Sequence, residues 1–163
     1  MIREARPADD AGISGVNTLA FGQEAEARLV EALRRDGDVI VELVWEQEGV
    51  IDGHILFSRL RTDRDGVFAA LAPMAVRPGQ QRGGVGSALV AAGLEWLREH
   101  GTHGVLVLGH RAYYPRFGFA AATAARVQAA YAGSPSFMAL ELKPGAFAEP
   151  IAVDYPAAFS AMA

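Results

Sequence analysis

The sequence contains no cysteine and only one lysine, Lys143, and both scarcities exclude particular kinds of chemistry. Without cysteine the chain forms no disulfide, no thiolate nucleophile and no sulfur-ligated zinc site. Because its only lysine lies near the C-terminal end, the chain also lacks the Lys-Ser/Thr pair of a P-loop. The formal net charge of -4 does not indicate a general affinity for DNA or RNA.

Long hydrophobic runs are also missing. No apolar stretch approaches the length needed to span a bilayer, and the opening residues MIREARPADD are charged from the third position, unlike a signal peptide. We therefore expect no membrane association and a cytoplasmic location. The chain has 163 residues, 51% of them hydrophobic, with no internal repeat or linker, which predicts a single domain over residues 1–163.

Hydrophobic periodicity predicts a sheet of mixed direction with helices on both faces. Helices are expected from Asp9–Asp10 up to Gly22, over 24–35, over 84–100 and, as a short piece, within 112–119. Strands are expected over 1–6, 39–45, 50–60, 67–76, 105–108 and 136–142. Because the 84–100 helix connects two buried strands, those two strands should be parallel. Pro73 cannot donate to a ladder, so its strand should bulge or leave a neighbour there.

The segment QQRGGVGSALV places Gly83, Gly84 and Gly86 directly in front of the predicted 84–100 helix. The first N–H groups of a helix have no internal partner and, with the helix dipole, favour an anion. A dinucleotide fingerprint would need a third glycine where Leu89 stands and an acidic residue about 20 residues later, in the apolar 105–108 region. The pattern Gln/Arg-x-x-Gly-x-Gly/Ala, the pyrophosphate loop of acyl-CoA transferases, fits Gln81 to Gly86 at every fixed position. A turn that only needs positive φ is the alternative.

Two segments together resemble the signatures of the GNAT N-acetyltransferase superfamily. LAPMAVRPGQQRGGVGSALV resembles the family's core motif, and GHRAYYPRFGF resembles its second signature, in which a tyrosine lies four residues before a Gly-Phe pair. Here the tyrosine is Tyr114 and the pair is Gly118–Phe119. The start IREARPADD and the tail SFMALELKPGAF are also similar to one bacterial branch of the family. The resemblance implies the α/β (α+β) GNAT fold, whose mixed, mostly antiparallel sheet contains a splayed parallel strand pair.

The resemblance further implies transfer of an acetyl group from acetyl-CoA to a primary amine by direct attack, without a metal. It assigns pantetheine contacts to the backbone of Met74, Ala75 and Val76, with the Met74 N–H as oxyanion donor. It assigns the pyrophosphate to the backbone N–H groups of Arg82, Gly83, Gly84, Val85, Gly86 and Ser87, with Gln81 as a further cofactor-binding residue. Tyr114 is then the general acid for the leaving thiolate, with Tyr113 as the alternative.

The general base is left open by the sequence. Glu26 is a weak candidate, beside Glu24 and Glu141, and an α-amino acceptor with a pKa near 8 would need no strong base. His110 adjoins the expected cleft and either contacts a substrate or makes a structural hydrogen bond. His100 and His103 lack a third metal ligand, so no zinc site is expected.

The acceptor is expected to be a small-molecule or peptide amine. Edge strands at the ends of the chain could pair in a homodimer. Three rival interpretations stay open: an acyltransferase with another acyl group or acceptor, a non-catalytic acyl-CoA-binding or regulatory module on the same fold, and a plain interaction domain.

Overall fold

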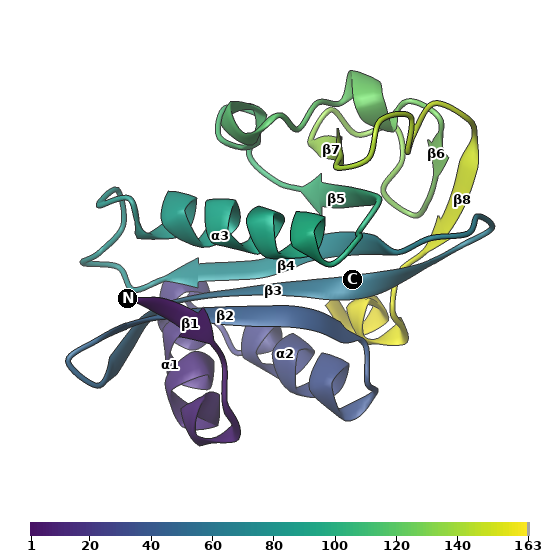
Figure 1. Cartoon of the computed structure of the whole chain (residues 1–163). Coiled ribbons are helices and arrows are strands. Elements are labelled where there is room, and N and C mark those ends of the chain that lie inside the picture. The colour runs from purple at the N-terminus through teal and green to yellow at the C-terminus, as the bar shows by residue number, and fades with distance from the viewer. Residues whose placement is uncertain (163) are drawn as a thin grey trace.

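The computed structural model describes residues 1–162, which build an eight-stranded sheet with helices on both faces (Figure 1). The helices are α1 (Asp10–Phe21), α2 (Ala25–Arg35) and α3 (Val85–Glu99). Short 3-10 segments cover Pro7–Asp9, Tyr114–Phe117, Ala122–Ala124 and Ala157–Met162. The strands are β1 (Ile2–Glu4), β2 (Val39–Gln47), β3 (Val50–Thr62), β4 (Phe68–Val76), β5 (Gly104–Leu108), β6 (Val127–Gln128), β7 (Phe137–Glu141) and β8 (Ile151–Asp154). None of the helices within residues 1–162 has both the length and the apolar character needed to cross a membrane.

The strand directions match the sequence prediction of a mixed, mostly antiparallel sheet. In the order β1-β2-β3-β4-β5-β7, only the β4–β5 neighbours are parallel. Helix α3 makes the crossover between them and covers one face, while α1 and α2 lie on the other (Figure 1). The predicted fold class is therefore confirmed, and the crossover brings the glycine-rich turn to the end of β4.

The parallel pair separates partway along its length. Its ladder ends at Ala70 and Leu106, although both strands continue beyond that pair. On its other side β4 pairs with β3, where a register shift leaves an extra residue on β4 between Leu71 and Met74. The irregularity expected at Pro73 is thus confirmed as a bulge. Beyond it, the β5-facing edge of β4 has no partner strand within residues 1–162.

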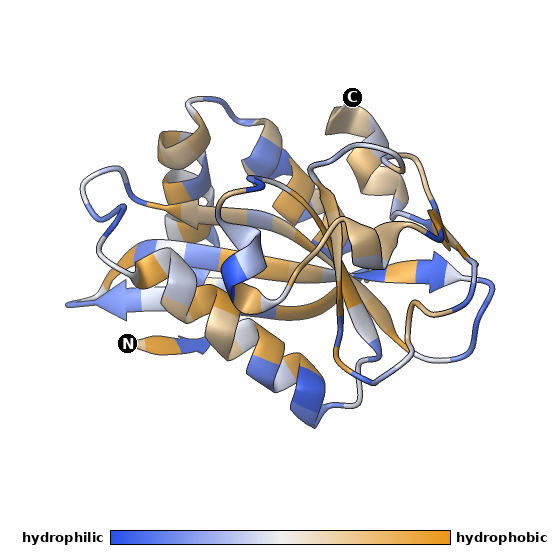
Figure 2. Cartoon of the chain, turned by 90° about the horizontal axis from the view of Figure 1, so that it is seen from above, coloured by the Kyte–Doolittle hydropathy of each residue, from blue (hydrophilic) through white to orange (hydrophobic). Residues whose placement is uncertain are grey.

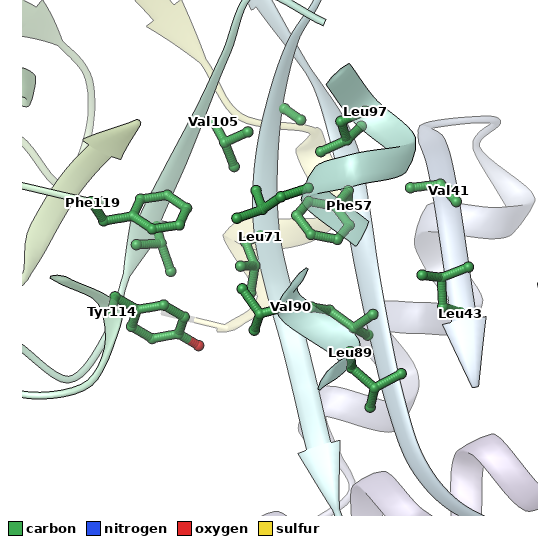
Figure 3. Packing of buried hydrophobic residues seen from close by; sticks show 14 of the residues in the cluster. Val41, Leu43, Phe57, Leu71, Leu89, Val90, Leu97, Val105, Tyr114 and Phe119 are labelled. Atoms are coloured by element: carbon green, nitrogen blue, oxygen red, sulfur yellow. The ribbon is translucent and has the colours of Figure 1, made fainter. Parts of the chain in front are cut away.

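Helix α3 packs closely on the sheet through its apolar stripe. Leu89, Val90 and Leu97 are buried against the ring of Phe57 on β3, as Figure 3 shows. A Cβ placed on Gly93 would lie 2.3 Å from a carbon of the Phe57 ring. The glycine therefore allows the helix to approach the sheet where any side chain would force it away. Figure 2 shows the same pattern, with hydrophobic residues along the sheet and hydrophilic residues in the outer turns.

A buried polar network ties α1 and α2 to the sheet on the opposite face. The Asn17 side-chain N–H donates to the Ile13 carbonyl and lies 3.1 Å from His54 Nδ1, so this ring nitrogen is the acceptor. His54 Nε2–H then donates to Glu42 at 2.6 Å, and Arg34 also donates to Glu42. Burial lowers the pKa of His54 and keeps the ring neutral. His54 is therefore a structural residue.

The C-terminal part differs most from the sequence prediction. The strands β6 and β8 and the 3-10 segment Ala157–Met162 have no counterpart among the predicted elements. β8 pairs with the far end of β3 at Arg61 and Thr62, and with β6. This return of the chain brings the last described residues against α2 and β4.

Candidate active site

The glycine-rich turn presents free N–H groups at the start of α3. Gly84 is the residue before the helix and has a φ of 88°, and Arg82 also has a positive φ of 70°. The first bond into the helix runs from Ala88 N–H to the Gly84 carbonyl at 2.9 Å. The N–H groups of residues 85–87 precede that bond and lie at the positive end of the helix dipole.

Side chains fix this turn to the end of β4. Gln81 Nε2 donates to the Val76 carbonyl at 3.0 Å, so the side chain of this predicted cofactor residue connects the turn to the last residue of β4. Arg77 Nε donates to Asp52 Oδ1 at 2.8 Å, and its backbone N–H to the Asp52 carbonyl. The position of the turn is therefore set by β3 and β4 before any ligand binds.

The turn opens onto a cavity of about 760 Å³, here named the loop cleft. Its lining residues come from the end of α1, from β4, from the turn and from the second sequence signature: Ala20, Phe21, Met74, Val76, Gln81, Arg82, Gly84, Gly86, Ser87, His110, Tyr113 and Arg116. Of the predicted cofactor residues, Ala75, Gly83 and Val85 do not line it. The side chain of Ala75 belongs to the core under α1 and α2, and that of Val85 to the core under α3.

Arg116 is a cleft residue that the sequence reasoning missed. Its guanidinium lies 4.5 Å from the centroid of the Tyr113 ring, and its Nε donates to the Tyr113 carbonyl at 2.9 Å. With Arg82 it places two cations around an opening that already carries the helix dipole. Its position within the second sequence signature, GHRAYYPRFGF, is the signal from which its place at the cleft could have been predicted. The cleft is therefore positively polarised although the chain as a whole is acidic.

Tyr113 lies at the point where the turn meets β4. Its hydroxyl is 2.9 Å from Ser87 Oγ. A methyl group built on Gly86 would lie 3.4 Å from that hydroxyl and 3.5 Å from the Met74 methyl. Tyr113 therefore borders both the helix start and the bulged part of β4.

Tyr114 is turned into the protein, next to Tyr113. It is only 7% exposed, its ring packs directly on Gly109, and it lies beside Phe119 (Figure 3). Burial, with a smaller contribution from the neighbouring Tyr113, raises the pKa of Tyr114 to about 12. Tyr114 therefore carries its proton throughout the physiological pH range.

Tyr114 lines a second cavity of about 500 Å³, here named the aromatic cavity. Its walls come from the end of α1, from α2, from the ends of β4 and β5, and from the C-terminal part: Phe21, Glu26, Leu29, Ala70, Leu71, Ala72, Pro73, Met74, Leu106, Leu108, Gly109, His110, Tyr114, Tyr131, Tyr155, Phe159 and Met162. Phe21, Met74 and His110 line both cavities. The two cavities therefore meet where β4 leaves β5.

Only one of the three candidate bases lies at this site. Glu26 is 9% exposed, lines the aromatic cavity and accepts hydrogen bonds from Gln23 Nε2 at 3.1 and 3.2 Å. Glu24 instead forms an exposed ion pair with Arg28. Glu141 accepts the Phe147 N–H at 2.8 Å, away from both cavities.

The other histidines divide between the site and the scaffold. His110 lines both cavities, which confirms its expected position beside the cleft. His100 stacks on Trp96, and His103 Nδ1 accepts the Val67 N–H. Over the described range, 1–162, no group of three or more metal-ligating side chains is present.

Comparison with known proteins agrees with this geometry. The family model described as the acetyltransferase (GNAT) family matches residues 14–119. The uncharacterised N-acetyltransferase YjhQ of Escherichia coli K12 is 43% identical over 116 residues, which are 68% of this chain and 64% of that protein. This chain thus spans less than two thirds of the length of YjhQ. The uncharacterised N-acetyltransferase YhbS of the same strain is 36% identical over 121 residues, 73% of this chain and 72% of that protein.

Two solved structures share the fold over almost the whole chain. The E. coli GNAT family N-acetyltransferase YhbS, solved in complex with CoA, matches with a TM-score of 0.90 and 33% identity over 98% of this chain and 91% of that one. A GNAT family acetyltransferase from Brucella melitensis, solved with acetyl-CoA, matches with a TM-score of 0.81 and 33% identity over 98% and 97%.

Proposed function

Because this chain belongs to the GNAT family of acetyltransferases, we propose that it transfers an acetyl group from acetyl-CoA to a primary amine by direct attack. One observation carries the proposal: a polarised cleft and a cavity with a carboxylate meet at Met74, where β4 separates from β5. A direct transfer needs such a meeting point, because the amine and the thioester must be held in contact.

The loop cleft is the proposed seat of acetyl-CoA. The N–H groups of residues 85–87, with Arg82 and Arg116 at the opening, would hold the pyrophosphate. The unpaired edge of β4 beyond the bulge offers the backbone groups of Met74 and the N–H of Val76 to the pantetheine amides. A free N–H on this edge, as the resemblance assigns to Met74, would stabilise the oxyanion. When bound, acetyl-CoA supplies the activated acetyl group.

Tyr114 is the proposed acid for the leaving thiolate, with Tyr113 as the alternative. With a pKa of about 12 in Tyr114 against about 8.5 for a thiol, complete proton transfer is uphill by about 5 kcal/mol. We therefore assign Tyr114 the role of hydrogen-bond donor to the developing thiolate. Tyr113 reaches the loop cleft directly, but its hydroxyl is engaged with Ser87.

Glu26 is the proposed receiver of the amine. Its carboxylate faces the aromatic cavity, where it can bind the ammonium form and accept a proton as the neutral amine forms. The Gln23 side chain holds this carboxylate in place.

Thermal unfolding with and without acetyl-CoA tests the first half of the proposal, with NADH and ATP as control ligands. A ligand that binds only the folded state raises the midpoint by mass action. We expect a rise with acetyl-CoA alone, followed by thiol release when a panel of primary amines is added. Binding without release for any amine would instead indicate a CoA-binding module that does not transfer. No rise at saturating acetyl-CoA would refute the assignment of the loop cleft.

A further inference from the structure

We infer that the aromatic cavity selects a small primary amine that carries one positive charge on an uncharged, aromatic body. This inference rests on the proposed function and adds the class of acceptor. It follows from three independent features of the cavity: its walls, its charges and its size.

The far wall of the cavity is a chain of aromatic side chains. Tyr131 packs edge-on against Tyr155 with ring centroids 5.0 Å apart, and Tyr155 packs against Phe159 at 5.3 Å. Phe21 and Tyr114 line the same cavity from α1 and from the second sequence signature. Ring faces and edges at several angles favour a flat aromatic body over a flexible polar chain.

This wall is a particular property of the C-terminal part of the chain. Tyr131, Tyr155 and Phe159 all lie beyond residue 119, where the match to the family model ends. Tyr155 and Phe159 reach the cavity because β8 pairs with β3 and the chain then returns over α2. Tyr131 follows β6, which pairs with β8, and packs against Tyr155. The acceptor preference is therefore expected to follow this segment rather than the shared motifs.

The charges of the cavity fit a single ammonium. Glu26 is the only carboxylate on its walls among residues 1–162, and within the same range no lysine or arginine lines it. An acceptor with its own carboxylate would bring a second negative charge next to Glu26 without a lysine or arginine to balance it. His110 is the one imidazole on these walls among residues 1–162. A polyamine would leave its further ammonium groups against apolar walls, which costs free energy for each unpaired charge.

Burial keeps the hydroxyl groups in this region neutral. It raises the pKa of Tyr155, with Tyr131 adding to the effect, and it raises that of Tyr114 to about 12. Near pH 8 the hydroxyl groups of Tyr114 and Tyr155 therefore carry no charge. The volume of about 500 Å³ lies within the usual range for small-molecule sites, roughly 300–1,000 Å³.

Three probe amines separate the alternatives: 2-phenylethylamine, phenylalanine and spermidine. Phenylalanine has the same ring and amine but adds a carboxylate, and spermidine replaces the ring with further ammonium groups. Transfer is measured as thiol release from acetyl-CoA, and amine binding by calorimetry in saturating CoA. We expect kcat/KM for 2-phenylethylamine to exceed that of both other amines by at least about tenfold, as expected when a buried charge is left unpaired.

Two variants locate the effect. Glu26→Gln keeps the shape and removes the charge, and Tyr131→Ala opens the aromatic wall. Each should lower kcat/KM for 2-phenylethylamine by at least about tenfold, the usual scale for losing a well-placed contact, with acetyl-CoA affinity unchanged. Glu31→Gln, at an exposed position on the same helix, is the matched control and should leave both quantities unchanged. A thermal midpoint for each variant identifies loss of folding.

The outcomes distinguish this inference from the function on which it rests. Equal or faster transfer to spermidine or phenylalanine would overturn the aromatic-amine preference while the acetyltransferase proposal stands. Binding of 2-phenylethylamine without thiol release would support the preference and contradict the transfer. Absence of 2-phenylethylamine binding, or wild-type kcat/KM in folded Glu26→Gln and Tyr131→Ala, would overturn the inference.

Discussion

Replacing Gly84 with glutamate should abolish CoA binding at a modest cost in stability. Gly84 has a φ of 88°, and a Cβ at this position would have no other atom within 4 Å, so the main structural penalty is the left-handed backbone, about 1–2 kcal/mol. The new carboxylate stands at the start of α3, where the pyrophosphate is proposed to bind. Two like charges about 6 Å apart repel by about 3 kcal/mol at an effective dielectric of 20. The combined charge and bulk should weaken CoA binding by more than about 100-fold.

The matched control is Gly37→Glu. Gly37 has a φ of 74°, is equally open and lies outside both cavities, so it carries the same backbone penalty without the charge at the cleft. Calorimetric titration with CoA measures affinity, and thermal unfolding measures the shared loss of stability. The reasoning is refuted if both variants lose similar stability and Gly84→Glu still binds CoA within about threefold of the unmodified protein, about 0.6 kcal/mol.

Four further predictions concern the acid, the packing and the charges. Tyr114→Phe should retain CoA affinity and lose about 100-fold or more in kcat, the usual effect of removing a hydrogen-bond donor to a developing negative charge, whereas a comparable loss only in Tyr113→Phe would assign that role to Tyr113. A pH–rate profile should show kcat/KM rising with pH as the amine is deprotonated. Because the pKa of Tyr114 is raised to about 12, kcat/KM should show no decrease at any pH up to about 10. Gly93→Ala should destabilise the fold by about 1–3 kcal/mol through overpacking against Phe57. Gly15→Ala, in α1 and with open space around the new Cβ, should instead stabilise the fold by up to about 1 kcal/mol. Urea unfolding measures both changes. Arg3 donates two hydrogen bonds to the Asp9 carboxylate, at 2.7 and 2.8 Å, and lowers the pKa of Asp9 from 3.8 to about 2. The stability that Asp9 contributes is therefore present above pH 4 and lost as pH falls toward 2, and screening limits it to about 1 kcal/mol. The thermal midpoint of Asp9→Asn should depend less on pH over that range.

The first two thirds of the fold could be predicted because local signals and tertiary packing agree there. The α3 helix has a glycine-rich start, an apolar stripe and Gly101 just after its end, so its limits follow from the sequence. The bulge at Pro73 follows from a missing backbone donor. The loop cleft could be located for the same reason, because its main parts are backbone groups that glycine and helix geometry fix.

The aromatic cavity could not be predicted in the same way. Tyr131 and Tyr155 lie in a region rich in alanine and proline, where no spacing indicates a buried face. Tyr155 directly follows β8, whose few residues pair with the far end of β3, and Tyr131 follows the two-residue strand β6, which pairs with β8. Such short pairings have no local signature. The sequence also does not show which of Glu24 and Glu26 faces the cavity. In the folded protein Glu26 points into the aromatic cavity and Glu24 forms an exposed ion pair, because of the way in which α2 packs on the sheet.

The two cavities share three lining residues, Phe21, Met74 and His110, and are otherwise lined by different residues, so one cavity can be altered while most of the other stays unchanged. The loop cleft is lined mainly by the turn, the start of α3 and the second sequence signature, with contributions from α1 and β4, whereas the aromatic cavity draws its aromatic wall largely from the last third of the chain. A graft of residues 127–162 from a relative with the same fold would therefore exchange the aromatic wall of the proposed acceptor cavity and leave the residues proposed to bind acetyl-CoA in place. In such a fold, sequence changes in the C-terminal segment would alter the acceptor while the proposed acetyl-CoA site stays the same.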